Sequence, residues 1–171
     1  YDNFKIDDFK TRKIYATNTP GVLTETVAEH TIGLLFAIAQ RIVEADEFVR
    51  QKKFRGWEPM LFLGTDVRNK TLGIVGLGRI GGEVAKRMRD GFGLKIIYFD
   101  VKRNKELEKE LGIKYVSFSQ LLKESDFISI HVPLLPTTHH MFNLKEFKMM
   151  KPTAFLINTS RGAIINERDL V

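Results

Sequence analysis

The sequence contains no cysteine among its 171 residues, which excludes disulfides and thiolate metal sites. It also lacks a long apolar run, because the most hydrophobic stretch, residues 32–39, is far shorter than the roughly 20 residues that span a bilayer. Nothing in it resembles a signal peptide, and no methionine precedes Tyr1. We therefore expect a cytoplasmic protein without membrane contact, and a chain that is a piece of a longer one.

Charge of one sign is not concentrated in any segment. The 27 Lys and Arg residues exceed the 21 Asp and Glu residues and give a net charge of +6, but the two signs are mixed, as in KRNKELEKEL at residues 102–111. Such mixing is typical of a solvated helical face, so we expect no nucleic-acid partner. We also expect no metal, because no carboxylate stands at ligand spacing from the adjacent His139 and His140.

Strand-like and helix-like segments alternate along most of the chain. The pattern predicts strands at residues 72–75, 96–100, 113–116, 127–132 and 154–158. Helical periodicity lies between them, near residues 80–89, 104–111, 119–123 and 144–150. This alternation predicts an α/β fold with a doubly wound parallel sheet. Earlier in the chain we predict a short β-prone run at 13–18, one long helix at 24–53 and a loop at 54–64.

The stretch TLGIVGLGRIGGEVAKRMR at residues 71–89 carries the spacing G-x-G-x-x-G between a predicted strand and an amphipathic helix. Gly76 would allow the tight turn, Gly78 would let the backbone approach a pyrophosphate, and Gly81 would let helix and strand pack closely. Arg79 and Ile80 follow at the helix N-terminus, whose free N–H groups favour an anion. The simpler alternative is a tight strand–helix turn that binds nothing.

Asp100 ends the second predicted strand, about 20 residues after Gly81, which is the spacing of the ribose-binding acid in dinucleotide sites. A carboxylate there accepts a hydrogen bond from the adenosine ribose 2′-OH and repels a 2′-phosphate, so it favours NAD over NADP. Lys102 and Arg103 follow at once, and they either soften this discrimination or are plain surface charges. An ordinary strand-end aspartate is the other alternative.

Several motifs, taken in order, resemble the D-isomer-specific 2-hydroxyacid dehydrogenases, and the resemblance covers essentially all 171 residues. The motifs are YDNFKIDDFKTRKIYATNTPGVLTETVAEHTIGLL, GIVGLGRIG, YFD, LLKESDFISIHVPLLPTTHHMF and MKPTAFLINTSRGAIIN. The resemblance implies a Rossmann-type dinucleotide-binding domain at 21–171, truncated at its C-terminal end, after a remnant of a substrate domain at 1–20. The helix at 24–53 would join the two domains and contribute to a homodimer in the full-length protein.

The resemblance also implies the functional residues. Arg161 of the NTSRG stretch would bind the substrate carboxylate and polarise its carbonyl, and a guanidinium suits this role because it matches a carboxylate with two hydrogen bonds. The remaining cofactor contacts would be made by Thr26, by His131, Val132 and Pro133, and by Asn158, Thr159 and Ser160. The simpler alternatives are a structural arginine, polarity at a helix start, strand-end packing and turn hydrogen bonds.

The family's acid/base histidine and the glutamate that orients it come after this arginine, and the chain ends at Val171 before either. We therefore expect hydride transfer between NADH and a 2-keto acid, yielding a D-2-hydroxy acid, in the longer protein, and no turnover by this chain alone. His131 is the one local substitute for the missing acid. Two alternatives remain: a noncatalytic NAD(H)-responsive protein like the corepressors that resemble this family, and a methyltransferase, against which NTSRG argues.

The identity of the 2-keto acid is left open by the sequence. The stretch TNTPGVLT at residues 17–24 is similar to glyoxylate and hydroxypyruvate reductases. KESDFISIHVP and THHM also recur in relatives of the D-lactate dehydrogenase type.

Overall fold

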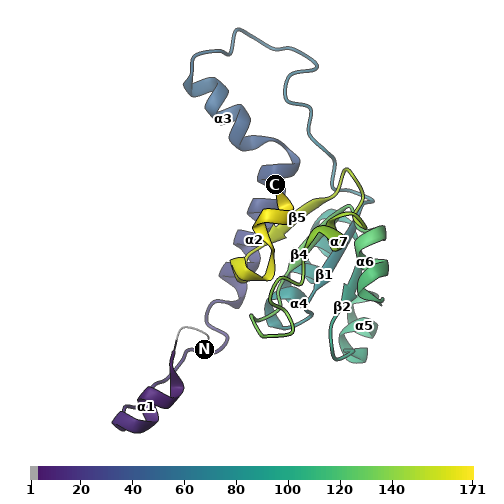
Figure 1. Cartoon of the computed structure of the whole chain (residues 1–171). Helices are drawn as coiled ribbons and strands as arrows, with labels where there is room; N and C mark the ends of the chain where they lie inside the picture. The colour runs from purple at the N-terminus through teal and green to yellow at the C-terminus, as the bar shows by residue number, and fades with distance from the viewer. Residues whose placement is uncertain (1–3) are drawn as a thin grey trace.

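A five-stranded parallel sheet forms the centre of the computed structural model, which describes residues 4–171 (Figure 1). The strand order is β3-β2-β1-β4-β5. The first strand therefore lies at the centre, β2 and β3 extend the sheet on one side, and β4 and β5 extend it on the other. The strands are β1 (Thr71–Val75), β2 (Lys95–Phe99), β3 (Lys114–Tyr115), β4 (Phe127–Ile130) and β5 (Phe155–Asn158). All neighbouring strands pair in parallel, which confirms the predicted doubly wound sheet.

Helices cover both faces of the sheet, because successive strand residues point to opposite sides and are apolar on each. On one face, α2 (Thr24–Ala39), α4 (Arg79–Phe92) and α5 (Lys105–Leu111) pack on strand residues such as Leu72 and Ile74. On the other face, α6 (Phe118–Glu124) packs with Val75 and Ile128. Three short elements lie in the last part of the chain: α7 (Leu144–Phe147), the 3-10 helix η1 (Gly162–Ile164) and α8 (Glu167–Leu170).

The predicted helix at 24–53 is two helices, so the prediction of one continuous helix was wrong. α2 ends at Ala39, and α3 (Ile42–Arg50) begins after Arg41, whose φ of 54° is left-handed. The break is held from a distance: the Thr65 N–H donates to the Ala39 carbonyl at 2.7 Å, and the Arg41 guanidinium lies 5.1 Å from the Phe62 ring centroid. The Thr65 N–H thus satisfies the Ala39 carbonyl, which a continuing helix would satisfy with one of its own N–H groups.

The β-prone run at 13–18 does not form a strand, and this prediction was also wrong. An unpredicted helix, α1 (Ile6–Arg12), precedes it, and none of that helix's residues is buried. The extended segment after α1 lies apart from the sheet (Figure 1). Among the described residues no strand pairs with it, and an extended chain needs such a neighbour to count as a strand. The first three residues of the predicted remnant at 1–20 lie outside the described residues.

A helix that crosses a bilayer must be about 20 residues long and predominantly apolar, a requirement that applies to each helix of residues 4–171. None of them is long and apolar enough to cross a membrane.

Gly73 on β1 tests the packing between the sheet and α6. A Cβ added there would lie 2.2 Å from the Ser125 hydroxyl oxygen and 2.8 Å from Leu121 Cγ. We expect Gly73→Ala to lower the free energy of unfolding by about 2 kcal/mol, the usual cost of overpacking. Gly33→Ala is the matched control, because Gly33 lies inside α2 with no atom within 4 Å of its Cβ position, and it should add about 0.5–1 kcal/mol. Urea unfolding measures both, and a Gly73→Ala protein as stable as the parent would contradict this packing.

Candidate functional site

The candidate site lies where the carboxyl ends of β1 and β4 meet, at the point where the strand order reverses. Open parallel sheets bind their ligands at such a switch point. The backbone fixes three strand ends together: the Gly76 N–H after β1 donates to the Phe99 carbonyl of β2 at 2.9 Å, and the His131 N–H after β4 donates to the Val75 carbonyl at 2.7 Å. The loops after β1, β2 and β4 therefore share one edge.

The three glycines of the β1–α4 turn have different structural roles. Gly76 has a φ of 96°, and a Cβ there would lie 2.9 Å from the His131 carbonyl group. A Cβ on Gly81 would lie 2.2 Å from the Gly76 carbonyl oxygen, so helix and strand could not approach as they do. Gly78, at the N-cap of α4, has no atom within 4 Å of its Cβ position. Gly78 is exposed, and a side chain there would enter the open space beside the helix N-terminus, called the cradle, where a pyrophosphate would approach.

Asp100 is joined to this turn by a hydrogen bond that the sequence did not reveal. Its Oδ2 accepts from the Leu77 N–H at 2.7 Å, and its Oδ1 accepts from the Lys102 N–H at 3.2 Å. The carboxylate is half-buried. The structure thus brings the predicted ribose-binding acid to the glycine turn, although the two are separated by more than twenty residues.

A cleft of about 280 Å³ opens beside the turn. It is lined by residues from the segment before α2, from the start of α4 and from the end of β4: Thr19, Gly21, Leu23, Thr24, Gly78, Arg79, Ile80 and His131. The guanidinium of Arg79 reaches across toward Gly21, whose Cβ position is 3.5 Å from Nη1. Four predicted cofactor residues therefore line one cleft.

The loop after β5 is fixed by side-chain hydrogen bonds. Asn158 accepts from the Ser160 N–H at 3.0 Å and donates to the Arg161 carbonyl at 2.9 Å. The Ser160 hydroxyl donates to the Val132 carbonyl, which ties this loop to the one after β4. Asn158, Ser160 and Val132 are thus brought together, as a shared nicotinamide-side role requires.

Thr31 was not predicted from the sequence as a site residue. Its hydroxyl, fully buried on α2, donates to the Val27 carbonyl at 2.7 Å and lies 2.8 Å from the Thr159 hydroxyl. The Thr159 hydroxyl is consequently the donor in that pair. A hydroxyl on the apolar stripe of a helix was the only available signal, since its partner lies far along the chain.

Ten of the fourteen predicted site residues do not line this cleft, and three of those ten are also exposed. Arg161 has an exposed side chain whose Nη1 donates to the Ser160 carbonyl at 3.0 Å, just beyond β5. Thr26 and Pro133 are exposed, on α2 and after β4. None of the three is among the cleft's lining residues within 4–171.

His131 is not arranged as an acid at neutral pH. Its Nε2 lies 2.8 Å from the hydroxyl of the fully buried Ser129, and burial lowers the pKa of His131 to about 4. The ring is therefore neutral at pH 7 and carries no second proton to give to a substrate oxygen. Within residues 4–171, no group of three or more His, Asp or Glu side chains could hold a metal ion.

The switch-point cleft, the glycine turn and the acid after β2 define a dinucleotide-binding domain of the Rossmann type. Comparison with known proteins narrows this class. Residues 32–171 match the family described as "D-isomer specific 2-hydroxyacid dehydrogenase, NAD binding domain", and the chain belongs to that family.

The chain is similar to proteins about twice its length. It is 55% identical to a glyoxylate reductase of Thermococcus litoralis, over 100% of this chain and 53% of that protein. A crystal structure of the TT0316 protein from Thermus thermophilus matches with a TM-score of 0.92 at 40% identity, over 99% of this chain and 53% of the other. D-Lactate dehydrogenase from Aquifex aeolicus, solved with NAD and lactic acid, matches with a TM-score of 0.86 at 36% identity, over 99% and 50%. The chain thus spans about half the length of the relatives it matches.

Gly78→Val tests the open cradle. Because no protein atom lies within 4 Å of that Cβ position, we expect the variant to fold normally and to bind NADH at least about tenfold more weakly. Gly91→Val, in the last turn of the same helix and equally open, should bind NADH as the parent does. Fluorescence titration gives both affinities. Unchanged NADH binding by a folded Gly78→Val protein would mean that no phosphate approaches this turn.

His131 also predicts a pH dependence of stability. Its pKa is lowered from 6.5 in the unfolded chain to about 4, so the unfolded state takes up the proton first as pH falls. The stabilisation is present above pH 6.5 and is lost between there and pH 4. Between pH 7 and pH 5 we expect the parent to lose about 1–2 kcal/mol more than His131→Gln, measured by urea unfolding. A His131 ring that titrates near its ordinary value by NMR would contradict this.

Proposed function

We propose that the protein to which this chain belongs is an NAD-dependent oxidoreductase that interconverts a 2-keto acid and a D-2-hydroxy acid. The single observation that carries the proposal is the open cradle at Gly78, set at the start of α4 and joined to the cleft beside it. Membership of the dehydrogenase family supports it, as does a 55% identical relative that is a glyoxylate reductase. A bound nicotinamide cofactor would supply or accept the hydride.

The residues of the turn fit a dinucleotide. The free N–H groups at the start of α4 and the Arg79 guanidinium would bind the pyrophosphate, with Gly78 and Ile80 lining its approach. Asp100, half-buried after β2, would accept from the adenosine ribose. The same carboxylate opposes a 2′-phosphate, which supports NAD over NADP. His131, neutral at pH 7, would border the cofactor together with Val132 and Pro133.

Arg161 would bind the substrate. Its guanidinium stays charged at any working pH and offers paired donors to a carboxylate. The Asn158 side chain holds the Arg161 carbonyl at 2.9 Å, which fixes the backbone from which this side chain extends. Asn158, Thr159 and Ser160, with Thr26 on α2, would face the nicotinamide. The acid/base group would come from outside this chain.

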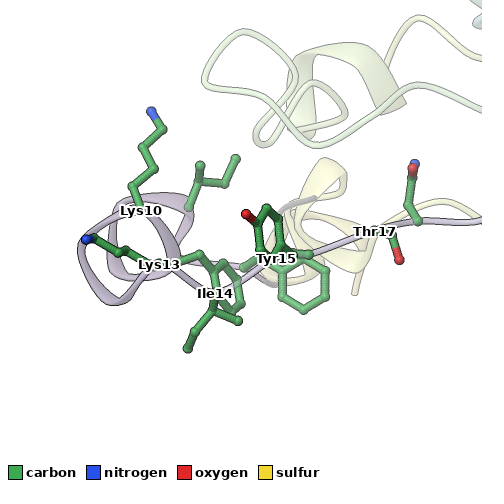
Figure 2. A pocket seen from close by; sticks show the side chains of 10 residues that line it. Lys10, Lys13, Ile14, Tyr15 and Thr17 are labelled. Carbon is green, nitrogen blue, oxygen red and sulfur yellow. The ribbon is translucent and has the colours of Figure 1, made fainter.

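The N-terminal segment would belong to the substrate domain. A pocket of about 540 Å³ is lined in part by the apolar residues Phe4, Ile6, Phe9 and Ile14. Figure 2 shows this pocket, with Ile14 labelled beside Lys10, Lys13, Tyr15 and Thr17. Ile6 and Ile14 are each 51% exposed, an apolar surface that the rest of that domain would cover. This supports assigning residues 1–20 to the substrate domain and 21–171 to the dinucleotide domain. We further propose a cytoplasmic homodimer, with the α2–α3 region at the interface, where Ile38, Ile42 and Val43 are exposed.

Arg161→Gln in the full reading frame tests the proposed activity. With NADH and a panel of glyoxylate, hydroxypyruvate and pyruvate, we expect the parent to turn over and the variant to lose at least about 100-fold in kcat/KM, because a paired charge-assisted contact is removed. Arg168→Gln, an exposed arginine nearby, is the matched control and should keep its activity. NADH binding without turnover of any of these acids by the parent would instead support a noncatalytic NAD(H)-responsive protein.

A further inference from the structure

Arg103 lies three residues beyond Asp100, close to the carboxyl end of β2, and its guanidinium is bound by Glu108 of α5. We propose that Glu108 determines cofactor selectivity: by engaging Arg103 it withholds that guanidinium from an adenosine 2′-phosphate and so preserves the preference for NAD(H). This inference rests on the proposed function and deepens it. Asp100 would discriminate by charge repulsion, whereas Glu108 would discriminate by occupying an arginine that is placed to attract the phosphate.

The ion pair occupies the Nε–Nη2 edge of the Arg103 guanidinium, one of the two edges that can pair with a phosphate. Arg103 Nε donates to Glu108 Oε1 at 2.7 Å, and Nη2 donates to Oε2 at 2.7 Å. The Arg103 side chain is 53% exposed, whereas that of Glu108 is only 13% exposed. Two parallel hydrogen bonds match a planar guanidinium to a carboxylate, and a phosphate would compete for the same donors. The less exposed partner is the acid, so the acid is the fixed member of the pair.

Tyr98 fixes Glu108 independently of Arg103. The phenol, fully buried in β2, donates to Glu108 Oε1 at 2.7 Å and accepts from the Asn104 N–H at 2.9 Å. Hydrogen bonds from Arg103 and Tyr98 lower the pKa of Glu108 to about 2, while burial raises the pKa of Tyr98 to about 12. Glu108 is therefore charged, and Tyr98 is a donor, throughout the pH range in which a dinucleotide would be bound. Glu108 is therefore positioned to bind Arg103 before any dinucleotide binds.

Tyr115 keeps the pair beside the ribose-binding acid. The Arg103 guanidinium lies 5.7 Å from the Tyr115 ring centroid, and the Tyr115 hydroxyl donates to the Asp100 carbonyl at 3.3 Å. In sheets of this type an arginine near the end of β2 accommodates a 2′-phosphate. The chain thus carries a group for a 2′-OH and a group for a 2′-phosphate three residues apart in the segment after β2. Because Glu108 binds Arg103, the relative affinity for NADH and NADPH depends on this ion pair.

A double-mutant cycle on this chain separates selectivity from simple helix stabilisation. The variants are Glu108→Gln, Arg103→Ala and the two combined, and Glu106→Gln on the exposed face of the same helix is the control for loss of one negative charge. The dissociation constants of NADH and NADPH are measured for each protein at low salt. Glu108→Gln keeps the shape and one acceptor for Tyr98, and it removes both the charge and the second acceptor that hold Arg103.

We expect Glu108→Gln to shift the NADPH/NADH affinity ratio toward NADPH by about fivefold, the size of one partly exposed ion pair. Glu106→Gln should leave the ratio unchanged, and adding Arg103→Ala to Glu108→Gln should abolish the gain. Arg103→Ala alone should not alter the ratio, because the guanidinium is already engaged. This last variant keeps the proposal testable even if Glu108→Gln folds poorly.

Either of two results would overturn this inference and leave the proposed function intact. One is a Glu108→Gln protein that binds NADH normally with an unaltered ratio. The other is a marked loss of NADPH affinity in Arg103→Ala alone, which would mean that Arg103 already reaches the phosphate. Failure of the parent to bind either cofactor would instead overturn the proposed function, and this inference with it, so the two failures are distinguishable.

Discussion

The close approach of Gly81 to the Gly76 carbonyl is the constraint on which the candidate site depends. With a Cβ position only 2.2 Å from that oxygen, no other residue lets α4 begin so near the end of β1. The approach directs the N-terminus of α4 at the carboxyl edge of the sheet. Gly76 in turn packs against the His131 backbone, which places the loop after β4 at the same edge. The cradle at Gly78 is a consequence of these two contacts.

The rest of the site is assembled on this turn by hydrogen bonds between segments far apart in the sequence. Asp100 joins the loop after β2 through Leu77, and Ser160 joins the loop after β5 to the one after β4. The Thr31–Thr159 pair then fixes α2 to the loop after β5. Each loop is held at its base by a strand or a helix, so the predicted cofactor residues extend from rigid elements. Rigid support of this kind is what positions a binding group accurately.

The sequence predicted the parts of the structure that depend on local pattern. Periodicity predicted all five strands and the four helices α4 to α7, though not η1 and α8, and the glycine spacing located the turn. The wrong predictions concern segments whose conformation depends on residues far away in the sequence. The break at Arg41 depends on Phe62 and Thr65, which periodicity within 24–53 does not contain. The buried role of Thr31 and the Glu108–Arg103 pair likewise depend on partners that only the folded chain supplies, and the run at 13–18 finds no neighbouring strand among the described residues.

The most direct test of the account is an NMR titration of the ¹⁵N-labelled chain with NADH, read at the backbone amides. The account predicts the largest shifts at Gly78, Arg79 and Ile80, followed by Leu77 and Asp100, because a pyrophosphate accepts hydrogen bonds from the first turn of α4. Amides around the separate N-terminal pocket, such as those of Ile14 and Tyr15, should not move. Saturable NADH binding that shifts the N-terminal pocket and leaves Gly78 to Ile80 unchanged would contradict it.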